Sequence, residues 1–271
     1  MPTIPLSPPS ASARTGTLLR GLAVLDILAA AGQPLGLAEI ASAAELDLST
    51  TLRLLRTLEE AQHVLRIGDG KRYLASPKTL RPLPLLHPIE QLRREADPIL
   101  RELAAKVSKT VVLVIFLGEE RLVVDVMQTA GSLSPYYTTW LHGPLYASAP
   151  GKALLLTMDE KRRREVLGPE PYVTYTTRTK TSWAAVSADL AGVDRGVVRV
   201  EDEFYDGLSA MAANFVSWDR QPVGCIAITG HTSDFDPAAC EMMANELISC
   251  ARLMPLQAGS LKALDQLVGR C

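Results

Sequence analysis

The chain has 271 residues, of which 47% are hydrophobic and 21% are charged, and this composition indicates a folded protein rather than a disordered one. Its formal net charge of −2 gives no overall attraction to nucleic acid or to acidic membranes, so a DNA-binding surface would need locally concentrated positive charge. The apolar runs are too short for a membrane-spanning helix, and the first residues lack the basic start and apolar block of a secretory signal, so we expect a cytoplasmic protein without a membrane partner.

Residues 1–16 are rich in proline and serine, which predicts a disordered arm. Apolar residues then recur at helical spacing over 17–31, and a turn and a short helix follow. A third helix begins near Ser49, and two short strands flank the turn at Gly68–Gly70. Three helices followed by a hairpin are the layout of a winged helix-turn-helix, which we assign to residues 17–76.

The third helix has two interpretations. A Ser-Thr start and exposed arginines are common in an ordinary capped core helix. In a DNA-binding helix, Ser49 would be the N-cap or a first-turn residue whose hydroxyl and nearby N–H groups meet a phosphate. The hairpin carries three cations opposed only by Asp69, which suits contact with a phosphate ridge and favours DNA binding. The residues expected to contact DNA are Thr50, Thr51 and Arg53 at base edges and Ser49, Arg56, Arg66, Lys71 and Arg72 at the backbone.

Four prolines between residues 77 and 88 forbid a continuous helix and predict a linker. Beyond it, an amphipathic helix over 89–107 opens a second domain, in which Pro98 either kinks the helix or lies near the start of its second half. Strands in hairpins with helices between them predict an α+β domain over 89–257 around one antiparallel or mixed sheet. Residues 258–271 form a C-terminal helix or tail that packs on the body or on a partner subunit, or frays. The expected strands are 110–117, 121–128, 136–141, 197–203, 209–215 and 222–229, and the expected helices include 152–156, 159–167 and 237–253.

No catalytic, metal or nucleotide site is expected. The four cysteines lie late in the chain without a CxxC pair, which indicates reduced, mostly buried thiols and no zinc site. The stretch "ASAPGKALLLT" lacks the first glycine and the hydroxyl residue of a Walker loop, because Tyr146 and Ala153 stand in those places. Histidines 142 and 231 could be combined with serines and aspartates into a hydrolytic set, but no G-x-S-x-G or HExxH motif occurs. We therefore expect neither an enzyme nor a bound cofactor.

The stretch from Arg20 to Ser76 resembles the DNA-binding domain of IclR-type bacterial transcription regulators. The shared pattern is Arg-x-Leu-x-(Ile/Val)-Leu, a Gly-x-Pro-Leu turn, Ser-Thr-x-x-Arg-Leu-Leu-x-x-Leu and a wing that ends in Tyr-Leu. Leu48 stands where a lysine is usual, so one phosphate contact is expected to be lost. The resemblance continues through "GPLYASAPGKALLL", "RGVVRVEDEFYDGLSAMAANF" and "PVGCIAITG". The residues that fill the first pattern are Arg20, Gly32, Pro34, Leu35, Ser49, Thr50, Arg53, Leu54, Leu55, Leu58, Tyr73 and Leu74.

The resemblance implies a GAF/profilin-like second domain that binds a small organic acid near residues 147–151, at a helix N-terminus. The acidic and serine positions that meet the acid in some relatives correspond to Val200 and Ala227, a cysteine of some relatives corresponds to Ala210, and Thr229 keeps a hydroxyl. Fewer donors imply a larger effector, such as an aromatic one, held by aromatic residues near the entrance unless these pack in the core. The effector-binding residues expected on this basis are Tyr137, Trp140, His142, Ser148, Ala149, Ala210, Ala227 and Thr229.

We therefore expect a ligand-responsive transcription regulator, a repressor that binds a pseudo-palindromic operator in double-stranded DNA as a homodimer or dimer of dimers. The effector would favour one packing of the C-terminal domains, and the linker would pass that preference to the paired DNA-binding domains. The alternative is a small-molecule sensor or an enzyme whose N-terminal helices only contact other proteins.

Overall fold

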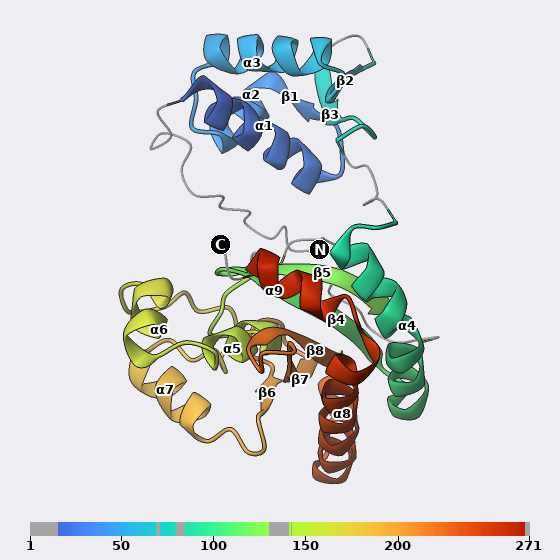
Figure 1. The fold of residues 1–271 in the computed structure, drawn as a ribbon. Coiled ribbons are helices and arrows are strands. Elements are labelled where there is room, and N and C mark those ends of the chain that lie inside the picture. The colour runs from blue at the N-terminus through green and yellow to red at the C-terminus, as the bar shows by residue number, and fades with distance from the viewer. Residues whose placement is uncertain (1–15, 69–70, 80–84, 130–140, 142, 269–271) are drawn as a thin grey trace. The chain divides into compact units, whose positions relative to one another are not determined.

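The structure, a computed structural model, describes residues 16–68, 71–79, 85–129, 141 and 143–268. The chain divides into two compact units, Met1–Pro82 and Leu83–Cys271, and each is considered by itself (Figure 1). Within the described residues no helix is long and apolar enough to cross a membrane. In the same part of the chain, no three potential metal ligands lie together.

The first unit is a three-helix bundle closed by a small sheet. In chain order it contains α1 (Thr17–Ala31), β1 (Leu35–Gly36), α2 (Leu37–Ala43), α3 (Leu48–Glu60), β2 (Val64–Ile67) and β3 (Arg72–Ala75). The strands are antiparallel in the order β1-β3-β2, so the hairpin of β2 and β3 forms the wing. The winged helix-turn-helix expected from the sequence is confirmed. Strand β1 was not expected, because two residues are too few to show an alternating pattern.

The core of the first unit comes from one face of each helix. Leu28 of α1, Ile40 of α2 and the pair Leu54 and Leu55 of α3 are buried together. Helix α1 ends where Gly32 adopts a left-handed φ of 62°, a conformation that glycine takes without steric cost. Since one stripe of α3 is buried in this core, its opposite stripe faces solvent.

The second unit has a five-stranded sheet between two layers of helices. Its elements are α4 (Pro88–Val107), β4 (Thr110–Leu117), β5 (Glu120–Met127), α5 (Ala149–Leu155), α6 (Glu160–Leu167), α7 (Trp183–Ala191), β6 (Val197–Glu201), β7 (Leu208–Val216), β8 (Pro222–His231), η2 (Thr232–Asp234), α8 (Pro237–Gln257) and α9 (Leu261–Val268). Every strand pair is antiparallel, in the order β5-β4-β8-β7-β6. The expected α+β class is confirmed, with the antiparallel sheet.

Strand β4 shows how the sheet separates two cores. Val111 and Leu113 pack in the core of α4 and α8, whereas Val112 and Val114 pack with α5. Successive side chains of a strand point to opposite faces of the sheet, so a strand covered on both faces is apolar at nearly every position. Figure 1 shows α4 and α8 on one side of the sheet and α5, α6 and α7 on the other.

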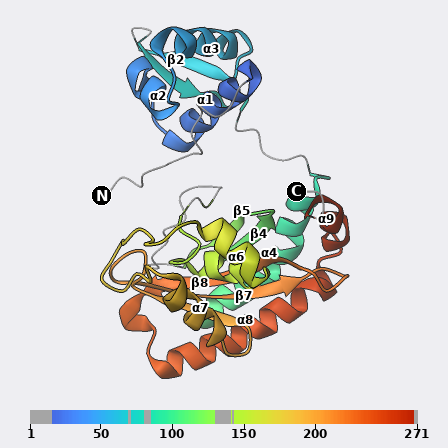
Figure 2. The same cartoon turned by 90° about the vertical axis from the view of Figure 1, so that its left-hand side faces the viewer.

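Helix α9 is part of the second unit's body. Ala258, Leu261 and Leu264 are fully buried in the same core as α4, and Figures 1 and 2 show α9 beside α4. Glu95 of α4 accepts hydrogen bonds from the N–H and the hydroxyl of Ser260 at 3.0 and 2.6 Å, which satisfies a donor at the start of α9. Of the alternatives left open for this segment, packing on the body is found.

Some boundaries differ from those expected from the sequence. Pro98 lies inside a continuous α4. Strand β6 ends before Asp202, where a left-handed φ of 53° turns the chain. The strand expected at 136–141 lies outside the described residues except for Leu141, whose N–H donates to the Arg121 carbonyl at 2.8 Å.

Candidate functional sites

Asp47, rather than Ser49, caps the start of α3. The Asp47 carboxylate accepts hydrogen bonds from the Ser49 hydroxyl at 2.5 Å and from the Thr50 N–H at 2.8 Å. These bonds, the one from Ser49 first, hold the pKa of Asp47 well below its usual range. Ser49 is therefore a first-turn residue. The expectation that its hydroxyl and the first N–H groups meet a phosphate is corrected, because a carboxylate already occupies the helix start.

Thr51 does not face the solvent. Its side chain is fully buried, and its hydroxyl donates to the Asp47 carbonyl at 2.9 Å. Residues three and four apart share a helix face, so Thr51 lies on the same buried stripe as Leu54 and Leu55. The expectation that Thr51 contacts a base edge is wrong.

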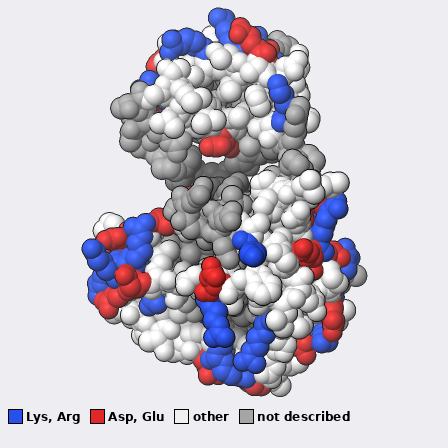
Figure 3. All heavy atoms as spheres, in the orientation of Figure 1, with Lys and Arg blue, Asp and Glu red and all other residues white. Residues whose placement is uncertain are grey.

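The outer face of α3 presents Ser49, Arg53 and Arg56 to solvent, with Thr50 half-buried beside them. Neither guanidinium has an ion-pair partner among the residues that the structure describes. On the wing, Lys71 is exposed as well. Figure 3 shows Lys and Arg side chains over α3, next to an acidic patch. Exposed guanidinium groups of this kind suit both base edges and phosphates.

The wing arginines are paired with acids from the neighbouring helices. Arg66 binds Glu59 at 3.0 Å and lies over the Tyr73 ring at 5.4 Å, and Arg72 binds Glu39 at 3.4 Å. The expectation that a single acid opposes the wing cations is therefore wrong, because α2 and α3 bring two glutamates beside the hairpin. All four charged side chains are at least a third exposed, so these pairs are weak and can be exchanged for phosphate contacts.

In the second unit, three expected effector residues lie on the sheet face that α5 covers. Ala210 pairs with Thr229 across β7 and β8, and Ala227 follows on the same face of β8. All three are buried. The Thr229 hydroxyl donates to the Ser209 carbonyl at 3.1 Å. These positions therefore offer methyl groups and one hydroxyl whose proton is already used within the sheet.

Ser148 and Ala149 lie at the start of α5. The Ser148 hydroxyl accepts a hydrogen bond from Arg121 Nη1 at 3.0 Å and donates to the Pro144 carbonyl at 2.8 Å. The buried Arg121 also donates through Nη2 to the Leu141 carbonyl at 2.9 Å. Ala149 is buried with the rest of α5. The remaining expected effector residues lie outside the described residues: Tyr137, Trp140 and His142.

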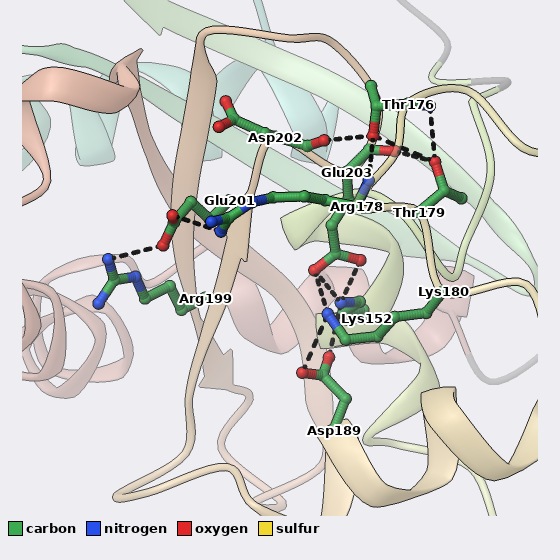
Figure 4. A network of polar contacts seen from close by, with 10 residues as sticks. All are labelled: Lys152, Thr176, Arg178, Thr179, Lys180, Asp189, Arg199, Glu201, Asp202 and Glu203. Atoms are coloured by element: carbon green, nitrogen blue, oxygen red, sulfur yellow. Dashed lines mark hydrogen bonds and ion pairs between the residues drawn. The ribbon is translucent and has the colours of Figure 1, made fainter.

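A buried charge network, not expected from the sequence, holds α5 in place (Figure 4). The Lys152 Nζ atom lies 2.6 Å from Asp189 Oδ2 and 2.8 and 2.7 Å from the two carboxylate oxygens of Glu203. Lys180 binds the same carboxylates, at 2.6 Å from Glu203 and 3.3 Å from Asp189. Burial lowers the pKa of Lys152, and the two carboxylates oppose that effect. The only signal in the sequence is a lysine within the apolar helix "APGKALL".

A surface cleft of about 390 Å³ lies between β6, α7 and α8. Its rim includes Arg195 and Glu241, whose side chains form an ion pair at 2.8 Å. None of the five expected effector residues that the structure describes lines this cleft, so those residues and the cleft are separate.

Two family models match the chain. The model described as "IclR helix-turn-helix domain" matches residues 17–66, and the model described as "Bacterial transcriptional regulator IclR C-terminal" matches residues 88–254. The transcriptional repressor IclR of Escherichia coli is 26% identical over 255 residues, which cover 93% of each chain. The acetate operon repressor of Salmonella typhimurium is 25% identical over 249 residues, which cover 91% of each chain.

Two solved structures share the fold. The IclR transcriptional regulator of Alicyclobacillus acidocaldarius has a TM-score of 0.73 at 23% identity and covers 90% of this chain and 98% of its own. An IclR homolog of Microbacterium hydrocarbonoxydans, complexed with 4-hydroxybenzoate, has a TM-score of 0.73 at 20% identity. That likeness covers 92% of this chain and 100% of the other.

Proposed function

Because the chain belongs to the IclR family of bacterial transcriptional regulators, we propose that it is a repressor whose operator affinity changes when a small organic acid binds. The chain is a ligand-responsive DNA-binding regulator: the N-terminal unit binds DNA and the C-terminal unit binds the effector. Its relatives are regulators rather than enzymes, and we propose the same of this chain. The observation that carries the proposal is the outer face of α3, where two exposed arginines stand without acidic partners among the described residues.

The proposed DNA-binding surface consists of this face of α3 and the wing. Arg53 is assigned to a guanine edge, which arginine recognises with two hydrogen bonds. Arg56, about one turn further along, is assigned to the DNA backbone, and Ser49 and Thr50 flank the base contact. The wing cations Arg66, Lys71 and Arg72 would follow a phosphate ridge. Two of these cations form ion pairs with glutamates. The non-specific attraction of the unit to DNA is therefore weak, and operator binding relies on two half-sites.

The proposed effector is an organic acid with an aromatic ring, bound on the α5 face of the sheet. Ala210 and Ala227 offer only methyl groups there, and the Thr229 hydroxyl donates within the sheet. Such a lining suits an apolar ring better than a small polar acid. The fold neighbour that carries 4-hydroxybenzoate supports this class of ligand. Ser148 and Ala149 stay in the proposed site because they begin α5, and residues 137, 140 and 142 stay in it as predictions from the sequence.

We also propose that the protein works in the cytoplasm as a homodimer or a dimer of dimers. A pseudo-palindromic operator presents two equivalent half-sites, which a twofold pair of winged units matches. The effector would bind one packing of the C-terminal units better than another, and this difference in affinity sets how far the DNA-binding equilibrium moves.

Fluorescence anisotropy with the full chain tests the proposal. A labelled duplex from upstream of the protein's own gene is titrated with protein, with and without 4-hydroxybenzoate as the first probe of an aromatic-acid panel. We expect the protein to bind this duplex specifically, to bind it with lower affinity when one of the acids is present, and to bind it more weakly as the Arg53→Ala variant. Arg252→Ala, which removes an exposed arginine of α8, serves as the matched control. An anisotropy that does not rise with protein concentration would contradict DNA binding. A duplex affinity that no acid in the panel changes would contradict the aromatic effector.

A further inference from the structure

The first residue of α3 is an exposed leucine. Leu48 is 54% exposed and lies directly between the cap Asp47 and the exposed Ser49. Leu48 is three residues before the buried Thr51 and so lies on the same side of α3, but at the first position of the helix its side chain is exposed. The first turn of the helix thus presents a large apolar side chain to solvent, one residue before Ser49 of the outer face.

The surroundings of Leu48 disfavour a phosphate. The Asp47 carboxylate stays ionised because the Ser49 hydroxyl and the Thr50 N–H donate to it. A negative charge at this end of α3 repels the DNA backbone, and a leucine side chain offers a phosphate no donor. If the first turn enters the groove, its contacts are made to bases.

A single exposed leucine is common on protein surfaces and calls for no explanation by itself. The position of Leu48 is what distinguishes it. The N-terminal residues of a recognition helix are the ones that reach base edges in the major groove, and Leu48 is in the same turn as Ser49. In the major groove, the one apolar group at a base edge is the C5-methyl group of thymine.

We propose that Leu48 recognises a thymine in each half-site through contact with its C5-methyl group. This inference rests on the proposed function, since it requires α3 to lie in the major groove. Leu48 is thus a specificity-determining residue that adds a thymine preference beside the guanine preference assigned to Arg53. Asp47 supports the same choice because it keeps the backbone away from this turn.

The test uses the full chain and removes one methyl group at a time. Binding sites are first enriched from a randomised duplex library, and each thymine of the enriched half-site is then replaced by deoxyuridine, which lacks only the C5-methyl group. Affinities are measured for the wild type, for Leu48→Ala and for Leu256→Ala. Leu256 is a matched control because it is an exposed leucine of α8, 77% exposed. Both leucines are exposed, so neither substitution opens a cavity, and thermal unfolding of each variant checks its fold.

At one thymine position, we expect deoxyuridine to weaken wild-type binding about fourfold per half-site. This factor corresponds to the free energy of transferring one methyl group out of water. Leu256→Ala should show the same loss, whereas Leu48→Ala should bind the thymine and deoxyuridine duplexes equally. A wild type that tolerates deoxyuridine at every position would overturn the role of Leu48, as would an undiminished penalty in Leu48→Ala. Enrichment of a defined sequence in either of those cases leaves the proposed function standing. Failure to enrich any sequence removes the proposed function and this inference with it.

Discussion

Replacing Lys152 by methionine should strongly destabilise the C-terminal unit. Lys152 is fully buried and Glu203 is 3% exposed at its side chain, and the two are joined at 2.7 and 2.8 Å. Methionine replaces the aliphatic part of the lysine side chain but not its ammonium group, and leaves Glu203 and Asp189 with a single cation, Lys180, between them. Removing one partner of a buried ion pair costs about 3–5 kcal/mol. For a unit of this size that corresponds to a fall in Tm of roughly 6–20 °C.

Urea unfolding followed by tryptophan fluorescence measures this change directly, because all three tryptophans, at positions 140, 183 and 218, belong to the C-terminal unit. The double variant Lys152→Met/Glu203→Gln leaves one cation and one carboxylate and should recover part of the loss. Lys106→Met is the control: this lysine binds Glu102 and Glu246 but is 48% exposed, so the cost should stay below about 1 kcal/mol. An equal loss of stability in Lys152→Met and Lys106→Met would contradict a stabilising role of the buried charge pair.

Three further predictions concern the C-terminal unit. Hydrogen bonds from Arg93, and then from Arg94, lower the pKa of Glu90 to about 2 from its ordinary value of 4.5. The stability that ionised Glu90 adds is therefore complete above pH 4.5 and is lost as the pH falls toward 2. Glu90→Gln should flatten the pH dependence of the urea midpoint between pH 2 and 4.5. Burial raises the pKa of Cys250 to about 12, so iodoacetamide at pH 8 should leave it unmodified in the native protein and label it in denaturant, as peptide mass spectrometry would report. Leu264→Asp places a charge in the core shared by α9 and α4 and should speed hydrogen exchange in α4, and unchanged exchange there would argue against docking of α9.

The first unit was largely predictable because its signals are local. Helical periodicity and Gly32 place α1, and a glycine-containing turn places the wing. What the sequence could not decide is which hydroxyl residue of the run 49–51 faces outward. That depends on where α3 begins. If the helix began two residues later, the side chain at each position of the first turn would belong to a residue about 200° further around the helix. Asp47 sets the start, and this turns Thr51 into the core.

The charged contacts were less predictable because they join residues far apart in the chain. Arg72 meets Glu39 through the packing of the wing beside α2, and no local pattern shows that pairing. The same holds for Lys152, whose partner Glu203 lies beyond the end of β6. The candidate effector residues on β7 and β8 could be placed on one face from their alternation. The use of the Thr229 hydroxyl within the sheet could not be foreseen.

We propose that the outer face of α3 recognises base sequence, and the ratio of operator to scrambled-duplex affinity tests this most directly. The ratio is measured for the wild type, Arg53→Ala and Lys71→Ala over a series of salt concentrations. We predict that Arg53→Ala lowers the ratio by roughly 5- to 150-fold. For Lys71→Ala we predict an almost unchanged ratio and a salt slope smaller by about 1. An Arg53→Ala protein that still discriminates as the wild type does would contradict the account.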